Sequence, residues 1–234
     1  MNLFHQELLE KIEKVSKKPR QTSEDTNYLG TKHFHYGLSV PQKREIIKNW
    51  VKKNASLKLD EFVALLISLS AGNSYEEKTT VGSLLECFSK LRWQIDPEIL
   101  NKLLEGYQGW AEVDSLCQST FGADEILSKW GDWKRIISQL NKNKNLHKKR
   151  ASLVLLTKPV RDTNDQRLLN LALRCIDSLK TEKDILITKT ISWLLRDLIK
   201  NFRTDVIKYL DQNSTALPAI VAREVRNKLN TGKK

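Results

Sequence analysis

Apolar residues recur every three or four positions through most of the chain, the spacing that places them on one face of an α-helix. The segment 58–71 shows the pattern with Leu59, Phe62, Leu65, Leu66 and Leu69. Strand-like alternation of apolar and polar residues is almost absent. The pattern therefore predicts an all-α fold, in which each helix buries one face.

Only nine glycines and five prolines interrupt these segments. The predicted helices cover 2–17, 41–54, 58–71, 74–91, 97–106, 110–121, 123–129, 132–141, 145–158, 163–179, 182–201, 203–212 and 217–229. Pro41 and Pro97 mark two of the starts, because proline lacks an N–H that the first helical turn leaves unpaired in any case.

A weak repeat is visible in the spacing of the predicted helices. The starts near 110, 145 and 182 lie about 35 to 37 residues apart, the period of HEAT-like helical pairs. Such antiparallel pairs stack into a curved solenoid, and here we expect its concave face to be basic. With no linker rich in Gly, Ser or Pro, we predict a single domain over 1–230 and a disordered tail over 231–234.

The composition favours a globular protein over a membrane protein. Of the 234 residues, 40% are hydrophobic and 29% are charged, as in ordinary globular proteins. No apolar run reaches the 18 residues or more of a membrane-spanning helix. The first residues lack the basic and apolar regions of a secretory leader, so we expect a cytoplasmic protein.

Cysteine and histidine give no sign of a disulfide framework or a metal site. Cys87, Cys117 and Cys175 are scattered and odd in number, which favours buried thiols. The four histidines, His5, His33, His35 and His147, form no zinc-binding spacing. We find no cofactor motif either, so neither a metal nor a cofactor is expected.

The charge balance points to a polyanionic partner. The chain carries 40 Lys and Arg against 28 Asp and Glu, a formal net charge of +12. Between 129 and 161, ten basic residues accompany a single acid, Asp132. This segment predicts a nucleic-acid surface, although a basic run can also be a solvated helix face.

Two predicted helices carry polar and aromatic residues that packing alone does not require. Trp110 and Asp114 are four residues apart, so an indole and a carboxylate share one helix face. Trp193 lies within a cationic stripe that suits binding along a phosphate backbone with an aromatic platform. The cations of that stripe are Lys189, Arg196 and Lys200. On composition alone, a core position for Trp110, with Asp114 as a surface or capping carboxylate, is the commoner arrangement. For the Trp193 stripe, an indole half-buried under aliphatic stems is as common as a binding surface.

A third predicted helix, 145–158, begins basic and ends apolar. Its basic residues are Lys148, Lys149 and Arg150. Because this end lies next to a strongly apolar stretch, we expect it to face water or an anion.

Four short blocks, in this order and spacing, resemble the bacterial AlkD-type DNA alkylation repair glycosylases, which are built from HEAT-like repeats. The first block is Tyr-Leu-Gly-Thr-Lys-His-Phe-His-Tyr-Gly-Leu-Ser-Val-Pro-Gln-Lys-Arg over 28–44. The others are Trp-Ala-Glu-Val-Asp-Ser over 110–115, Arg-Ala-Ser-Leu over 150–153, and 187–196 with its Trp-Leu-Leu-Arg end. The resemblance spans nearly the whole chain.

The resemblance implies hydrolytic release of N3- or N7-alkylated purines from duplex DNA. Asp114 is then the catalytic carboxylate, and Trp110 and Trp193 line the site. A deep pocket for a flipped base is not expected. The resemblance further implies a monomer that binds DNA through Tyr28, Lys148, Lys149, Arg150, Lys189 and Arg196.

Two positions depart from the family pattern. Gly109 stands where the family can show a second tryptophan, and His147 stands where it can show an aromatic residue. The preferred lesion therefore stays open. Two alternatives remain, a noncatalytic HEAT-like module that reads nucleic-acid shape and a protein-binding scaffold. Retention of Asp114 favours the enzyme.

Overall fold

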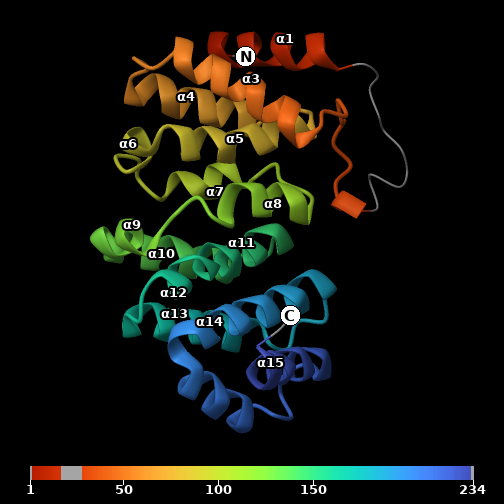
Figure 1. Ribbon diagram of the computed structural model, residues 1–234, viewed down its shortest axis with the longest axis vertical. Coiled ribbons are helices and arrows are strands. Elements are labelled where there is room, and N and C mark those ends of the chain that lie inside the picture. Colours follow the sequence, from red (N-terminus) through yellow and green to blue (C-terminus); the bar gives the residue numbers. More distant parts are fainter. Residues whose placement is uncertain (1, 17–27, 233–234) are drawn as a thin grey trace. The chain divides into compact units, whose positions relative to one another are not determined.

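The structure is a computed structural model that describes residues 2–16 and 28–232. The regular secondary structure of the described part is helical (Figure 1). The one exception among the described residues is an isolated parallel bridge between Phe34 and Ser74. The all-α prediction is confirmed. The helices are α1 (Leu3–Val15), α3 (Val40–Lys53), α4 (Leu59–Ser70), α5 (Tyr75–Cys87), α6 (Ser89–Arg92), α7 (Ile99–Leu103), α8 (Trp110–Cys117), α9 (Ala123–Ser128), α10 (Trp130–Asn141), α11 (Leu146–Thr157), α12 (Pro159–Asp162), α13 (Gln166–Leu179), α14 (Ile185–Gln212) and α15 (Ala219–Thr231).

Most predicted boundaries agree with the structure, and the exceptions have local causes. The predicted helix 74–91 is broken at Phe88, whose φ of −97° and ψ of 51° are not helical. The predicted helices 182–201 and 203–212 are parts of one element, α14, with a kink at Phe202 (φ −132°, ψ 40°). The sequence analysis missed α12, a single turn that begins at Pro159.

Side-chain caps explain several helix starts. Ser39 forms a capping box with Gln42, since its hydroxyl accepts from the Gln42 N–H while the Gln42 side chain accepts from the Ser39 N–H. Asn145 caps α11, and Asp184 caps α14, by accepting backbone N–H groups of the first turn. The starts of α3 and α11 lie within one residue of the predicted positions, whereas α14 begins three residues after the predicted start at 182.

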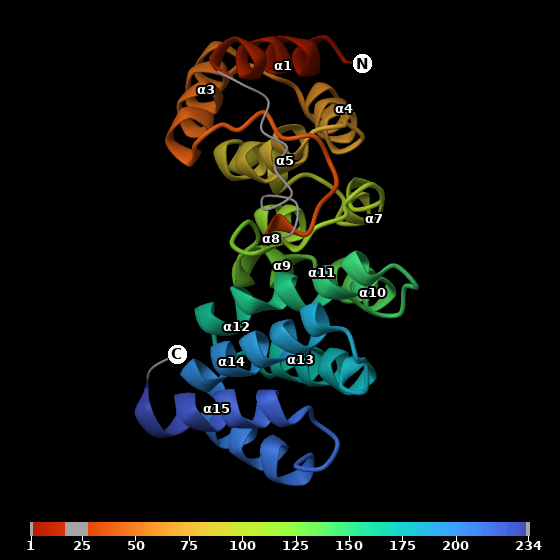
Figure 2. The same cartoon turned by 90° about the vertical axis from the view of Figure 1, so that its right-hand side faces the viewer.

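The contacts within the chain divide it into two compact units, Met1–Leu116 and Cys117–Lys234. In the first unit, α3, α5 and α8 lie on one side, and α4 and α7 lie on the other (Figure 2). Its core is apolar and includes the fully buried Trp50 and Phe62. The prediction of a single domain over 1–230 stays a prediction, as does the curvature of the helical stack.

The second unit consists of α9 to α15. Here α11 packs against α10, α13 and α14, and α14 also packs against α12 and α15. The tail prediction is only partly covered by the described residues. Helix α15 continues to Thr231 and ends at Gly232, whose φ of 69° is left-handed, whereas Lys233 and Lys234 lie outside the described part.

The lengths of the helices and the burial of the cysteines test two further predictions. In the described part of the chain, no helix is long and apolar enough to cross a membrane. None of the three cysteines is in a disulfide; Cys117 and Cys175 are buried as predicted, but Cys87, the last residue of α5, is exposed. The prediction of a buried thiol was wrong for Cys87, which lies at the last position of α5.

Candidate functional site

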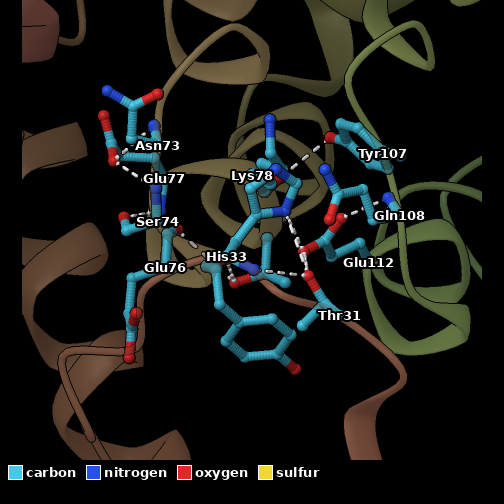
Figure 3. Close-up of polar contacts among 12 residues, drawn as sticks. Thr31, His33, Asn73, Ser74, Glu76, Glu77, Lys78, Tyr107, Gln108 and Glu112 are labelled. Carbon is cyan, nitrogen blue, oxygen red and sulfur yellow. Dashed lines mark hydrogen bonds and ion pairs between the residues drawn. The ribbon is translucent and has the colours of Figure 1, made fainter. Parts of the chain in front are cut away.

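The first turn of α8 is built around a buried carboxylate, Glu112. One carboxylate oxygen accepts hydrogen bonds from the Thr31 hydroxyl at 2.6 Å and from His33 Nδ1 at 2.7 Å. The other accepts from the Gln108 backbone N–H at 2.9 Å (Figure 3). Glu112 is fully buried. It therefore fastens the segment 28–35 to the start of α8.

The charge of Glu112 is maintained by these partners. Burial alone raises the pKa of Glu112, but the hydrogen bonds from His33 and Thr31 outweigh burial and hold the pKa below its ordinary value. The side chain is thus an anion at neutral pH, placed where the N-terminal end of α8 favours negative charge.

Trp110, the first residue of α8, contacts the segment that Glu112 holds in place. Its indole Nε1 donates a hydrogen bond to the backbone oxygen of Tyr28 at 2.6 Å. The Tyr28 ring meets the Trp110 ring edge to face, with centroids 5.8 Å apart. Tyr28 is 73% exposed, whereas Trp110 is half-buried. The pair therefore presents aromatic surface outward, with the indole N–H already bonded within the protein.

Asp114 lies one turn after Trp110 on α8 and is half-buried. This position places the carboxylate and the indole on the same face of the helix. The structure thus brings together three predicted site residues, Tyr28, Trp110 and Asp114, within the first unit.

Gly109 comes directly before Trp110, and the structure explains why this position has no side chain. A Cβ atom at this position would lie 2.5 Å from the Leu29 oxygen and 2.9 Å from the Thr31 Cβ. Gly30, with a φ of +67°, makes the turn that brings this segment so close. The segment 29–31 therefore occupies the space that a second tryptophan would need.

A second buried carboxylate, Glu76 of α5, holds the continuation of the same segment. It accepts from His35 Nδ1 at 2.8 Å and from the backbone N–H groups of Tyr36 and Gly37 at 3.0 Å and 3.1 Å. Burial raises the pKa of Glu76, and the His35 and Tyr36 hydrogen bonds lower it further than burial raises it. The segment is thus fixed at both α5 and α8.

His5 repeats the arrangement within the same unit. Its Nε2 lies 2.7 Å from Glu77 of α5, and its Nδ1 lies 2.8 Å from the Ser68 hydroxyl. Three of the four histidines therefore each pair with one buried glutamate. Among the described residues, no group of three or more His, Cys, Asp or Glu side chains is arranged to hold a metal.

In the second unit, the predicted stripe lies on α14. Lys189 is exposed, and Trp193 and Arg196 are half-buried. The Arg196 Nε donates to the Ser192 oxygen at 3.1 Å, and its guanidinium lies 3.9 Å from Glu224 of α15. Asp197, one helical turn after Trp193, forms an ion pair with Arg161 of α12 at 2.5 Å. The stripe is therefore accessible along part of its length.

The basic residues of α11 are placed differently from what their sequence suggested. Arg150 is buried and donates to the Leu186 oxygen at 2.9 Å and to the Thr190 hydroxyl at 2.5 Å. These contacts join α11 to the first turns of α14. They bind protein groups, whereas we had expected this end of the helix to face water or an anion.

The two lysines that precede Arg150 in the sequence are also buried or paired. Lys148 is buried, and Lys149 forms an ion pair with Glu182. The structure thus separates the predicted cations into exposed ones, such as Lys189, and buried or paired ones. Whether the latter contact DNA stays a prediction.

Sequence reasoning missed the residues that support the site. These are Thr31, His33 and Glu112. Their partners lie far away in sequence, 79 residues apart for His33 and Glu112, so no local spacing pointed to them.

Comparison with known proteins identifies the family and the fold of the chain. The DNA alkylation repair enzyme family matches residues 8–229 of the chain. A solved structure described as a predicted DNA alkylation repair enzyme from Enterococcus faecalis superposes with a TM-score of 0.68 at 16% identity. The match covers 92% of this chain and 99% of that one, and it shows a shared fold. No curated protein sequence matches significantly.

The chain therefore belongs to the DNA alkylation repair enzyme family, as the resemblance of the four sequence blocks predicted. At the level of the family, this makes it an enzyme of DNA repair with DNA as its substrate.

Proposed function

We propose that the protein is a monofunctional glycosylase that hydrolyses the N-glycosidic bond of N3- or N7-alkylated purines in duplex DNA. The observation that carries the proposal is the juxtaposition of Trp110 and Asp114 on one face of α8, in a chain of this family. The indole N–H is bonded to Tyr28, so the ring contributes its π face and the carboxylate its charge.

A single carboxylate suits this reaction. An alkylated purine is already cationic, so it departs as a neutral base when the C1′–N bond breaks and its nitrogen keeps the electron pair. Positive charge then develops on the deoxyribose, where the Asp114 carboxylate stabilises it. Water attacks C1′, and its proton passes to Asp114 or to solvent, leaving an abasic site. The general acid that most glycosidases need is unnecessary.

The aromatic residues have a complementary role in this proposal. The π faces of Trp110 and Trp193 attract the cationic sugar and base. The exposed Lys189 and the half-buried Arg196 bind backbone phosphates, which position the duplex without reading its sequence. Tyr28, exposed beside Trp110, extends this contact in the first unit.

The proposal is tested by incubating the purified protein with methylated duplex DNA and with the same duplex unmethylated. We expect free 3-methyladenine or 7-methylguanine by mass spectrometry, only from the methylated duplex. The strand should break only after alkali treatment, because a monofunctional enzyme leaves the abasic site intact. Salt-sensitive binding without any base release would instead favour the noncatalytic DNA-binding module.

A further inference from the structure

A small basic pocket lies between α10 and α13, which pack against each other in the second unit (Figure 2). Its volume is about 220 Å³. Three of the side chains that line it are cations: Lys134 of α10, Lys142 directly after α10, and Arg174 of α13. The pocket is smaller than the roughly 300 to 1,000 Å³ of sites for drug-sized ligands. It therefore suits one compact group.

Among the described residues, no carboxylate lines the pocket to balance these three charges. Each of the two helices carries one acid, and each acid is paired with a cation that does not line the pocket. Asp132 pairs with Arg135, and Asp177 pairs with Lys180. Burial raises the pKa of the Cys175 thiol to about 12, so this lining group is neutral as well. The pocket therefore has a net positive charge.

Hydrogen bonds among three helices fix the polar base of the pocket. Asn141 of α10 is buried and donates to the Ser152 hydroxyl of α11 at 3.0 Å and to the Cys175 oxygen of α13 at 3.2 Å. The Asn141 oxygen accepts from the Ser178 hydroxyl. The helices that carry the cations are thus already joined, and a ligand need not bring them together.

The pocket lies on a different side of α11 from the cationic stripe of α14. Ser152 of α11 faces α10 through Asn141, whereas Arg150 bonds the first turns of α14. Residues two apart point in nearly opposite directions on a helix. The contacts proposed between α14 and DNA therefore leave the cations of the pocket without a role.

We propose that the pocket between α10 and α13 binds a phosphate group. Phosphate is compact and anionic, and a guanidinium matches two of its oxygens, while lysines add point charges. Nε of Arg174 donates to the Asn170 oxygen at 3.1 Å, which leaves the two terminal nitrogens to face the anion. The phosphate belongs either to a small ligand or to the backbone of a nucleic acid, and the test separates these two sources.

The test follows the backbone amide resonances of the pocket as inorganic phosphate is added at neutral pH. Sodium chloride at equal ionic strength is the reference, since it supplies charge without the shape of phosphate. The resonances are those of Ser138, Asn141 and Cys175, which line the pocket. A second titration uses an unmodified duplex in place of phosphate.

The native protein is compared with two double variants. The first, Lys134→Gln with Arg174→Gln, removes one cation from each helix of the pocket. The matched control, Lys144→Gln with Lys208→Gln, removes the same charge from exposed positions of the second unit that do not line the pocket. Both variants change exposed side chains, so we expect both to fold.

We expect the native resonances to shift with phosphate and to saturate. The pocket variant should raise the phosphate Kd about 10-fold or more, because hydrogen bonds to charged groups are the stronger ones. The control should bind as the native protein does. A response to phosphate that the pocket variant weakens supports a small phosphate ligand. A response to the duplex alone, weakened in the same way, supports a nucleic-acid phosphate.

Pocket resonances that respond to neither phosphate nor duplex overturn the proposal. Shifts that persist unchanged in the pocket variant overturn it as well, because the anion then binds elsewhere. Equal weakening by the control shows a general effect of charge and has the same consequence. None of these measurements involves base release, so the proposed function stands or fails separately.

Discussion

The indole Nε1 of Trp110 donates a 2.6 Å hydrogen bond to the backbone oxygen of Tyr28, 82 residues earlier in the chain. The contact joins the segment after the first helix to the start of α8. It also explains why Trp110 can present its ring instead of its N–H to a ligand. The aromatic surface of the candidate site is therefore formed by two segments that are far apart in the sequence.

Gly109 makes this assembly possible, and replacing it should destabilise the protein. A Cβ at this position lies 2.5 Å from the Leu29 oxygen, a backbone atom that cannot move independently. We expect Gly109→Ala to lower the free energy of unfolding by about 1–3 kcal/mol, the usual cost of overpacking. Urea unfolding measures the change.

The control for Gly109 is Gly131→Ala in α10. A Cβ at Gly131 meets nothing within 4 Å, and alanine favours a helix, so this variant should be neutral or more stable. Equal destabilisation by the two substitutions would contradict the close approach of segment 29–31.

Glu112 should matter for stability more than an exposed glutamate. Glu112→Gln leaves an amide where three donors now meet a carboxylate. We expect a loss of about 3 kcal/mol, as for other broken buried networks. Glu105→Gln, at an exposed position, is the matched control and should change the unfolding free energy little. If Glu112→Gln unfolded at the same urea concentration as the native protein, the hydrogen bonds to Glu112 would not stabilise the fold.

The lowered pKa values of Glu76, Glu77 and Glu112 predict an acid-sensitive fold. A carboxyl whose pKa is lower in the folded than in the unfolded state stabilises the fold above its unfolded pKa. That stabilisation is lost as the pH falls through the folded pKa. The unfolding free energy should therefore decrease as the pH falls below 4.5, the ordinary pKa of glutamate.

Urea unfolding across the acid range measures this dependence, and Glu112→Gln identifies its source. The variant has lost one of the three carboxyls, so its stability should fall less steeply with decreasing pH than that of the native protein. Parallel curves for the two proteins would mean that Glu112 does not contribute to the acid sensitivity.

The exposed and buried cations should respond differently to mutation. Lys189→Gln should weaken duplex binding and reduce the slope of log K against log salt by about one, the loss of one phosphate contact. Arg150→Gln should chiefly lower the unfolding free energy, because Arg150 is buried against Leu186 and Thr190. Fluorescence anisotropy at several salt concentrations, together with urea unfolding, distinguishes the two. If Arg150→Gln instead weakened duplex binding and reduced its salt dependence, Arg150 would be a DNA contact.

The helical fold was predictable because the residues that define each helix are close together in the sequence. The apolar spacing of α4 and the Ser39 cap of α3 are properties of a few adjacent residues. The pairing of His33 with Glu112 is not, since it depends on how segments far apart in sequence pack. The burial of Arg150 was missed for the same reason: a basic side chain beside apolar residues can be satisfied by a carbonyl and a hydroxyl of another helix.

Asp114 is the proposed catalytic carboxylate, and single-turnover base release from methylated duplex tests this role most directly. Asp124→Asn, an exposed carboxylate of α9, is the matched control. We predict that the native protein and Asp124→Asn release the alkylated base, whereas Asp114→Asn binds the duplex with native affinity and releases none. Release by Asp114→Asn at the native rate would contradict the account.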